Sequence, residues 1–343
     1  MGRLEDGRVV FVPFVAAGET VRVEVVREHK SYLEARLLEV EEPSPRRVVP
    51  PCPYFGRCGG CSYQHLDAAE QRETKRRQVE SVLRRIGKLR EITVEPTVPS
   101  PQDYGYRNRL TVHAHDGAVG FFGHDSQGRR ALIDIAQCPI AEPAVNDALT
   151  RFRANPRRRD GHCTLRADGG HAGGFEQTND GAAAELLALV ARLLPAEGGP
   201  TTLIDAYCGA GFFARHLSGR FAQVVGLEWD RRAVAQARRH AAPHERYLDG
   251  DVGELLPDAL TAVALDATLL IVDPPSEGLA DPVRRAVLAQ PPAAMVYVSC
   301  NPATLARDLA ELAAAYEVQS VTPLDMFPQT AEIEVVVHLR KSA

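Results

Sequence analysis

The second half of the chain alternates short apolar runs with segments of helical periodicity, and this alternation limits the possible folds most strongly. Five apolar runs predict β-strands, at residues 201–207, 223–229, 246–251, 267–273 and 295–298, and two further candidate strands follow at 318–322 and 333–339. One helical pattern precedes the first strand, at residues 183–194, and two more follow the first and second strands, at residues 212–220 and 231–240. Strands that alternate with helices form a mostly parallel sheet with helices on both faces. The sequence therefore predicts an α/β domain here.

Polar or glycine residues follow each of the first five predicted strands. Ligands of open α/β sheets bind at the carboxyl ends of the strands. Similar chemistry at five separate strand ends is hard to explain by packing, so we expect these residues to share one site. They are Asp205 to Gly211, Glu228, Asp251, Asp273 and Cys300.

Cys300 occupies a predicted turn between a strand and a helix, within Val296-Tyr-Val-Ser-Cys-Asn-Pro302. Asn301 is a favourable N-cap and Pro302 suits the first helical position. A thiol beside a helix N-terminus is expected to have a pKa below the usual value of about 8.5. A small cysteine buried in the core is the alternative, because free cysteine is among the most buried residue types.

The first strand ends predict a nucleoside ligand. Gly209 and Gly211 allow close approach of a ligand before a helix, but the third glycine of a dinucleotide fingerprint is missing. A carboxylate at Glu228 would accept hydrogen bonds from both ribose hydroxyls, and Asp251 would accept one from an adenine amino group. An adenosine ligand without a pyrophosphate fits, and S-adenosylmethionine is such a ligand. The alternative is that Glu228 is simply a surface acid.

The first residues of the chain predict a small β-domain. Candidate strands lie at residues 8–13, 21–25 and 31–38, without an intervening helix, as in small barrels of the OB type. A proline-rich stretch at residues 41–53 then predicts a stiff linker.

Four of the seven cysteines predict a metal centre. Cys52, Cys58 and Cys61 have the spacing C-x5-C-x2-C in a glycine-rich loop, and Cys138 shares with Cys52 a following proline. Four thiolates suit either structural zinc or an iron–sulfur cluster. The spacing between Cys52 and Cys58 is wide for a zinc knuckle, which favours an iron–sulfur cluster.

Charge is distributed unevenly along the chain. The net charge of −5 excludes a protein that is basic as a whole. A helix is predicted over residues 67–90, and its part from Arg72 to Arg90 contains eight basic and two acidic residues. Arg151, Arg153 and Arg157 to Arg159 form a second basic group. These groups are either solvated faces or a footprint for phosphates.

Strands are also predicted in the middle of the chain, at residues 106–113, 119–122 and 131–135. Arg107 and Arg109 alternate with Leu110 and Val112, which predicts a basic face on this sheet. Phe121 and Phe122 are candidates for stacking on bases. The alternative for two adjacent aromatic residues is one in the core and one at the surface. No apolar run reaches the length of a membrane span and no signal peptide is apparent, so we expect a cytoplasmic protein without a membrane partner.

The chain as a whole resembles the RNA uracil-C5 methyltransferase family, in its iron–sulfur branch. The residues that carry the resemblance are Cys52, Cys58, Cys61 and Cys138, Phe175-x-Gln177-x-Asn179, Asp205-x-Tyr-Cys-Gly-x-Gly211, Glu228, Asp273-Pro-Pro275, Ser299-Cys-Asn-Pro302, and Asp325-Met-Phe-Pro-Gln-Thr330 with Glu332-Ile-Glu334. The resemblance implies a TRAM-like RNA-binding barrel over residues 1–48 with its first strand missing or short, a central iron–sulfur and RNA-binding domain over 49–175, and a class I (Rossmann-like) methyltransferase domain over 176–343.

The resemblance also implies a mechanism and its residues. Cys300 is expected to add to C6 of a uracil, so that C5 accepts a methyl group from S-adenosylmethionine, and Glu334 to remove the C5 proton. Gln177, Tyr207, Glu228 and Asp273 are expected to bind the methyl donor, and the four cysteines a 4Fe-4S cluster. The expected partner is RNA, ribosomal RNA rather than transfer RNA, and no obligate protein partner is evident.

Two residues differ from the common pattern of that family. Ser276 stands where arginine is usual, which places a salt bridge or RNA contact in question. Glu332 stands where histidine is usual, and a second carboxylate is expected to raise the pKa of Glu334. Competing hypotheses are a transfer RNA enzyme of the same family, a cytosine-C5 methyltransferase, cluster-based radical chemistry, and an inactive RNA-binding protein. A cytosine enzyme would need a cysteine after the fourth strand, and Asp273-Pro-Pro-Ser276 has none.

Overall fold

The chain folds into two units in the computed structural model, which describes residues 2–4, 7–125, 128–155, 160–167, 177–195 and 198–342. Unit 1 comprises Met1–Gln71, Gln102–Gly169 and Phe327–Ala331, and unit 2 comprises Arg72–Pro101, Gly170–Met326 and Glu332–Ala343. Most of helix α1 (Ala68–Arg85) therefore groups with the second half of the chain. The division into domains at residues 48 and 175 remains a prediction.

Unit 2 contains a seven-stranded sheet with the order β11-β10-β9-β12-β13-β15-β14. The first five strands in this order are parallel, whereas β15 pairs antiparallel with both β13 and β14. All residues of β9 and β12 are buried, as expected for strands covered on both faces. The strands are β9 (Thr202–Ala206), β10 (Gln223–Glu228), β11 (Glu245–Asp249), β12 (Thr268–Val272), β13 (Ala294–Ser299), β14 (Tyr316–Leu324) and β15 (Glu334–Lys341). The predicted α/β class is confirmed.

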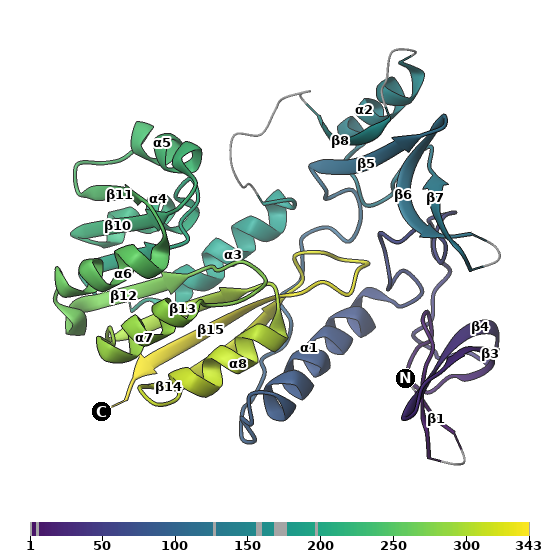
Figure 1. The fold of residues 1–343 in the computed structure, drawn as a ribbon, viewed down its shortest axis with the longest axis horizontal. Coiled ribbons are helices and arrows are strands. Elements are labelled where there is room, and N and C mark those ends of the chain that lie inside the picture. The colour runs from purple at the N-terminus through teal and green to yellow at the C-terminus, as the bar shows by residue number, and fades with distance from the viewer. Residues whose placement is uncertain are drawn as a thin grey trace. The chain divides into compact units, whose positions relative to one another are not determined.

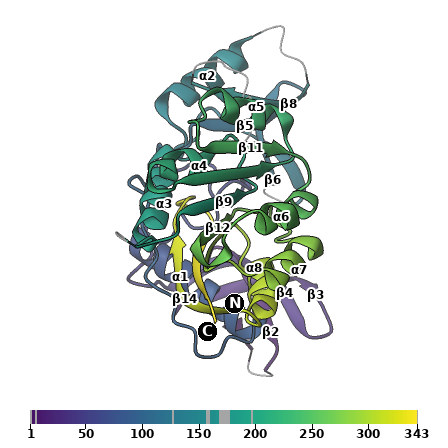
Figure 2. The same ribbon diagram turned by 90° about the vertical axis from the view of Figure 1, so that its left-hand side faces the viewer.

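Helices cover both faces of this sheet. Figure 2 shows α3 and α4 on one side, and α6 and α7 on the other. The core includes Leu256 of α6, Val283 of α7 and Leu305 of α8, packed with Ile204 of β9. The helices are α3 (Asp180–Leu193), α4 (Phe212–Leu217), α5 (Arg231–Arg239), α6 (Val252–Thr261), α7 (Asp281–Ala289) and α8 (Pro302–Leu312).

Two predicted helices end earlier than expected. The helix predicted to Arg90 ends at Arg85, because the chain turns at Gly87 and Lys88, whose φ is 56°. The helix predicted over 212–220 is α4 followed by a separate 3-10 turn, Ser218–Arg220. Helices α6 and α7 were not predicted individually, and α6 contains Pro257, which is unfavourable inside a helix.

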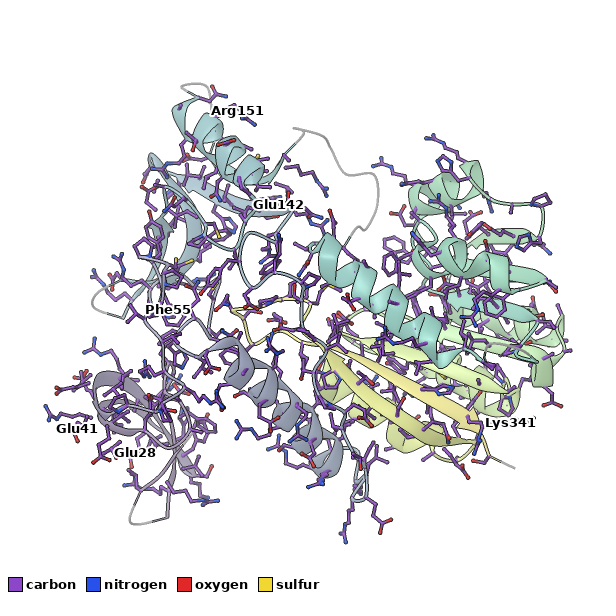
Figure 3. All side chains as sticks on the ribbon, turned by 180° about the vertical axis from the view of Figure 1, so that it is seen from behind. Glu28, Glu41, Phe55, Glu142, Arg151 and Lys341 are labelled. Atoms are coloured by element: carbon purple, nitrogen blue, oxygen red, sulfur yellow. The ribbon has the colours of Figure 1, made fainter. Side chains whose placement is uncertain are left out.

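The N-terminal part of unit 1 is a four-stranded sheet with the order β1-β2-β4-β3. Its strands are β1 (Gly2–Arg3), β2 (Val9–Phe11), β3 (Thr20–Glu28) and β4 (Tyr32–Glu42). Glu28 and Glu41 project outward from β3 and β4 (Figure 3) and pair with Arg8 and Arg22. Closure of these strands into the predicted barrel remains a prediction.

A second four-stranded sheet in unit 1 has the order β7-β6-β5-β8. Helix α2 packs along one face (Figure 1), where Val145 and Leu149 meet Leu110 and Val112 of β5. Strand β8 and helix α2 were not predicted. The elements are β5 (Arg109–His115), β6 (Ala118–His124), β7 (Arg130–Asp134), α2 (Pro143–Ala154) and β8 (Gly161–Arg166).

Among the described residues, no helix is both long enough and apolar enough to cross a membrane. Two sequence predictions, on Phe175 and on Arg157 to Arg159, lie outside the described residues.

Candidate functional site

The turn after β9 bends sharply at the carboxyl edge of the sheet in unit 2. Tyr207, Gly209 and Gly211 have φ values of 65°, 55° and 86°, in the left-handed region that favours glycine. A Cβ atom placed on Gly209 would meet nothing within 4 Å, so there is open space beside this backbone. A non-glycine residue in this conformation stores strain, as at Tyr207, and such strain is often found at ligand sites.

Glu228 is held at the end of β10 by backbone groups. It is only 7% exposed, and its carboxylate accepts hydrogen bonds from the N–H groups of Gly209 (2.9 Å) and Asp230 (2.8 Å). These bonds fix both carboxylate oxygens beside the glycine turn. Each oxygen retains a lone pair for a further donor, which is the arrangement that a ribose diol requires. The geometry therefore argues against a simple surface acid.

Asp205 lies behind the same turn and is fully buried. Its Oδ2 accepts a hydrogen bond from the N–H of Ala214 at 2.8 Å, whereas its Oδ1 has no hydrogen-bond partner among the described residues. Burial raises the pKa of Asp205 to about 8, and the charges of Asp273 and Glu228 act in the same direction. A buried carboxyl with one oxygen unpaired is expected to bind a proton.

Asp251, the predicted adenine contact, is the N-cap of α6 and is exposed. Its Oδ1 accepts a hydrogen bond from the N–H of Gly253 at 2.8 Å. One carboxylate oxygen is thus engaged in capping, and the second is the one suited to an incoming amino group. Gln177 precedes α3 at the boundary of the described residues and is half-buried.

Cys300 lies one position beyond the last residue pair between β13 and β15. That pair is Ser299 with Val335, so the antiparallel register continues to Cys300 opposite Glu334. Cys300 is exposed, and Glu334 is 6% exposed at the first position of β15. The strand register therefore places the predicted nucleophile and the predicted base side by side.

The turn that carries Cys300 has the predicted capping structure. Asn301 caps α8 by accepting a hydrogen bond from the N–H of Ala303 at 3.0 Å. Its amide nitrogen donates to the carbonyl of Ser276 at 2.9 Å, and the hydroxyl of Thr304 donates to the same oxygen at 3.0 Å. These two hydrogen bonds join the loop after Asp273 to the Cys300 turn. Both are accepted by the backbone of Ser276 and do not involve its side chain.

The pKa predicted for Cys300 is wrong in direction. We expected the helix N-terminus to lower it, but burial of the thiol raises the pKa to about 11, and the carboxylates of Glu334 and Asp273 raise it further. Although the residue is exposed overall, the protein around the sulfur removes part of its hydration. Burial, together with the two nearby acids, outweighs the effect of the helix N-terminus.

The carboxyl groups beside Cys300 also have raised pKa values. Burial raises the pKa of Asp273 to about 7. Burial raises the pKa of Glu334 well above its ordinary value, and the charge of Asp273 adds to this effect. We predicted that the charge of Glu332 would raise the pKa of Glu334. The carboxylate that does so is instead that of Asp273. Glu332 is exposed and instead acts on Cys300 and on Lys75.

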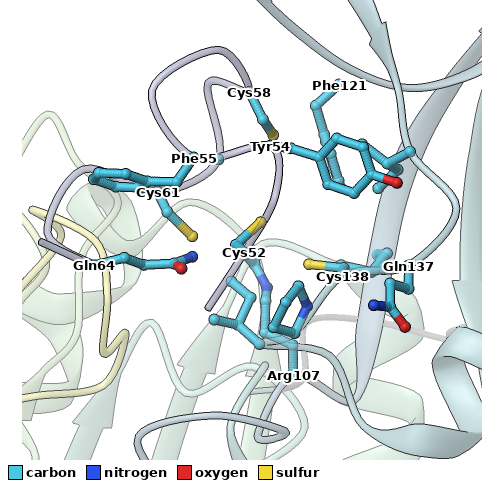
Figure 4. Close-up of a pocket in the computed structure, with 15 residues that line it drawn as sticks. Cys52, Tyr54, Phe55, Cys58, Cys61, Gln64, Arg107, Phe121, Gln137 and Cys138 are labelled. Carbon is cyan, nitrogen blue, oxygen red and sulfur yellow. The ribbon is translucent and has the colours of Figure 1, made fainter. Parts of the chain in front are cut away.

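The four predicted metal ligands line one pocket in unit 1. Figure 4 shows the side chains of Cys52, Cys58, Cys61 and Cys138 directed toward a common space. Burial raises the pKa of Cys61 to about 12 and that of Cys138 to about 11, and repulsion among the thiolates contributes. Gln64, which is 1% exposed, hydrogen-bonds the sulfur of Cys61.

The spacing of these sulfur atoms bears on the kind of metal. Among the described residues, no three of these cysteine sulfurs lie within 4.8 Å of one another. A tetrahedral zinc ion with bonds of 2.3 Å would bring all four to about 3.8 Å. The pocket is therefore wider than a single zinc ion requires.

Two family models match the chain. The model described as tRNA (Uracil-5-)-methyltransferase matches residues 259–342, and the TRAM domain model matches residues 1–38. An uncharacterized RNA methyltransferase of Protochlamydia amoebophila is 30% identical over 98% of this chain and 93% of its own length. The 23S rRNA (uracil(1939)-C(5))-methyltransferase RlmD of Thiobacillus denitrificans is 30% identical over 96% of this chain and 94% of its own.

The chain belongs to the RNA uracil-5-methyltransferase family. A tRNA (uracil(54)-C(5))-methyltransferase of Schizosaccharomyces pombe is 29% identical over 98% of this chain and 74% of its own length. The tRNA (uracil-54, C5)-methyltransferase of Pyrococcus abyssi, solved with S-adenosyl-L-homocysteine, superposes with a TM-score of 0.72 over 98% of both chains, at 24% identity. That likeness confirms the fold. As a member of this family, the protein is an RNA methyltransferase.

Sequence reasoning missed a buried ion pair in this methyltransferase. The ammonium of Lys75, on α1, lies 2.6 Å from Oδ1 of Asp325, and neither residue is more than 2% exposed. The negative charge of Glu332, two positions before Glu334, also favours the charged form of Lys75 and so raises its pKa. Lys75 was not distinguished from the solvated arginines of α1 because the sequence of this helix is basic throughout. Its position four residues before the apolar Val79 places it on the buried face and could have identified it.

A second network that the sequence did not reveal lies behind the Cys300 turn. Asp308 of α8 is fully buried and accepts hydrogen bonds from the hydroxyl of Tyr297 (2.7 Å) and the N–H of Leu279 (2.8 Å). Arg284 of α7 pairs with the same carboxylate. Because Tyr297 is in β13, these bonds fix the strand that carries the candidate nucleophile.

Proposed function

We propose that this methyltransferase transfers the methyl group of S-adenosylmethionine to C5 of a uridine in RNA, through a covalent bond between Cys300 and C6. The register that sets Cys300 opposite Glu334 carries the proposal. Uracil C5 is a poor nucleophile, so a sulfur must first add next to it and a base must afterwards remove the C5 proton. The relatives named as uracil-C5 methyltransferases support the same reaction.

The methyl donor supplies an electrophilic methyl group when it is bound. Its ribose hydroxyls would meet Glu228, and its adenine the second oxygen of Asp251. The open space beside Gly209 and the two fixed oxygens of Glu228 fit such a ligand. Tyr207, Gln177 and Asp273 complete the set of proposed binding residues.

The nucleophilic step begins with transfer of the Cys300 proton to solvent, to which this residue is exposed. The thiolate bonds to C6, and the C5–C6 π electrons move toward the C4 carbonyl, which gives an enolate that is nucleophilic at C5. C5 then bonds to the methyl group of the donor as the methyl–sulfur bond breaks, and the sulfur leaves as a neutral thioether with the electron pair. Glu334 accepts the proton from C5, the C5–C6 double bond forms again, and the bond between Cys300 sulfur and C6 breaks to release the thiolate. A carboxylate whose pKa is raised by burial is a stronger base than an exposed one, so the surroundings of Glu334 suit this step.

We also propose that the four cysteines hold a 4Fe-4S cluster. Their convergence on one pocket and the wide spacing of their sulfurs support a cluster over a single zinc ion. Raised thiol pKa values are consistent with ligands that release protons only when a metal binds. Iron and sulfide analysis of anaerobically purified protein, with a Cys61→Ser variant as the control, measures this directly.

Ribosomal RNA is the proposed substrate, on the combination of a TRAM domain with the cysteine pocket. The relatives include enzymes named for 23S rRNA and for transfer RNA, so transfer RNA is the alternative. Base-resolution mapping of 5-methyluridine in RNA from cells with and without the gene distinguishes them.

Trapping with RNA that contains 5-fluorouridine tests the reaction. Fluorine at C5 cannot leave as a proton, so the wild type is expected to form a covalent complex that survives denaturation. Cys300→Ala should form none, whereas Cys163→Ala, which changes a cysteine of unit 1, should trap normally. A complex with Cys300→Ala would overturn the nucleophile assignment.

A further inference from the structure

The sheet β7-β6-β5-β8 of unit 1 has one face without a helix on it among the described residues. Leu110, Val112 and Ala114 of β5 point toward α2, so the alternate residues lie on the opposite face. Phe122 is 44% exposed there, although large aromatic side chains are usually buried. Its neighbour Phe121 lines the cysteine pocket on the other face. The two phenylalanines are thus one pocket residue and one surface residue.

Cross-strand pairs on this open face bring like side chains together, namely two arginines, two threonines and two histidines. Strand β5 pairs with β8 so that Arg109 faces Arg166, Thr111 faces Thr164, and His113 faces His162. Two arginines opposite one another place positive charge on this face. Asp134, an acid of β7, is paired with Arg153 of α2. A polyanion is the partner that this pattern fits.

Two side chains lie close to the ring of Phe122, those of Arg130 and His113. The guanidinium carbon of Arg130 is 5.0 Å from the centroid of the Phe122 ring, and the ring of His113 is 4.7 Å away at an angle of 53°. An exposed ring with arginine beside it is the usual platform for an unpaired base, since the base stacks and the arginine meets the phosphate. A paired helix offers no free base to such a ring.

The strand segment that carries Phe122 is also joined to the cysteine loop. The carbonyl of Phe122 accepts a hydrogen bond from the N–H of Gly59 at 3.2 Å, and the N–H of His124 donates to the carbonyl of Arg57 at 2.9 Å. Cys58 forms an isolated bridge with Gly123. The loop therefore extends the sheet beside the platform and holds it in position.

We propose that this open face binds a single-stranded segment of the RNA substrate, with a base stacked on Phe122 and phosphates beside Arg130. The proposal rests on the proposed function only in that RNA is the substrate. It adds a docking surface distant in sequence from Cys300 and independent of the chemical step.

Fluorescence anisotropy of the full-length protein with a short, unstructured, labelled oligoribonucleotide tests this surface. Phe122→Ala is expected to weaken binding by about 5- to 100-fold, the range for loss of one stacked base, while Phe122→Trp retains it. Arg130→Gln should lower the slope of log K against log salt concentration by about 1. Arg129→Gln is the matched control, because it removes the same charge one position earlier, where the side chain pairs with Asp125.

The outcomes separate this proposal from the proposed function. Equal RNA affinity of wild type, Phe122→Ala and Arg130→Gln would overturn the docking surface, even if uracil methylation were intact. Equal losses for Arg130→Gln and Arg129→Gln would also overturn it, since they would indicate only bulk charge. Weakened RNA binding by Phe122→Ala, with unchanged calorimetric binding of S-adenosylmethionine, supports the surface whether or not C5 methylation is detected.

Discussion

The thiol of Cys300 is near two carboxylates, which add to the effect of burial on its pKa. Glu334 and Asp273 both disfavour a thiolate in the protein without ligands. A cationic ligand beside Asp273 would reverse that effect, since opposite charge favours ionisation. The sequence predicted one site for these residues, but it could not predict the sign of the pKa shift, which depends on burial and on three strand ends meeting.

Alkylation of Cys300 by iodoacetamide should therefore be slow near neutral pH in the ligand-free protein. The rate is expected to rise with pH toward the thiol pKa of about 11, because only the thiolate reacts. Glu334→Gln removes one nearby charge and should accelerate alkylation at pH 8. Mass spectrometry of the peptide that contains Cys300 follows the rate. A rate independent of pH between 7 and 9 would contradict the assignment of these charges.

Stability should depend on pH through Asp205, whose pKa is raised to about 8. A carboxyl with a raised pKa in the folded state binds more protons folded than unfolded, so it favours folding below its unfolded pKa. This contribution is lost as pH rises from about 4 to about 8. Urea unfolding of Asp205→Asn should show a weaker decrease over that interval than the wild type. An identical decrease in both proteins would assign the effect to other groups.

At the scale of elements, helix α1 is joined to the end of β14 by the ion pair between Lys75 and Asp325. The two residues are 250 positions apart, and no local pattern connects them. Periodicity predicted the strands and most helices of unit 2 because each buries a regular face. It did not predict α2, β8 or this pair, since their partners are distant in sequence.

Lys75→Met should destabilise unit 2 by about 3–5 kcal/mol, because it leaves the carboxylate of Asp325 buried without its counter-ion. Adding Asp325→Leu is expected to recover part of the loss. Arg84→Met on the same helix is the control, since Arg84 is exposed and its pair with Glu80 contributes about 0.3–0.5 kcal/mol. Urea unfolding measures all four proteins. Equal effects of Lys75→Met and Arg84→Met would contradict a role for burial.

The cysteine loop and β6 approach each other so closely that glycine is required at Gly123. A Cβ atom there would lie 1.9 Å from the carbonyl oxygen of Arg57. Gly123→Ala is therefore expected to displace the loop and to reduce the iron content of purified protein. Gly219→Ala, where a Cβ meets nothing within 4 Å, should retain it. Retention of full iron by Gly123→Ala would show that the loop tolerates displacement.

At the scale of the molecule, the two proposed ligands belong to different units. The methyl-donor residues and Cys300 are in unit 2, and the four cysteines are in unit 1. The motifs of the sequence predicted both sets of residues. The motifs did not predict that Arg72–Pro101 belongs to unit 2 and Phe327–Ala331 to unit 1. A segment belongs to the unit with which it makes most contacts, and the order of the sequence does not reveal those contacts.

Hydrogen exchange should reveal this separation. S-adenosylmethionine at 100 times its Kd stabilises the state that binds it by about 2.7 kcal/mol and should protect the strand ends of β9 and β10. Removal of the metal should increase exchange in residues 52–61 and in β6. Protection of the cysteine loop by the methyl donor alone would contradict independent sites.

The interleaved path of the chain has a consequence for how such an enzyme is inherited. Unit 2 takes its segments from three separate parts of the sequence, and a five-residue segment of unit 1, Phe327–Ala331, interrupts it shortly before Glu334. A single recombination point can therefore transfer neither unit whole to another gene.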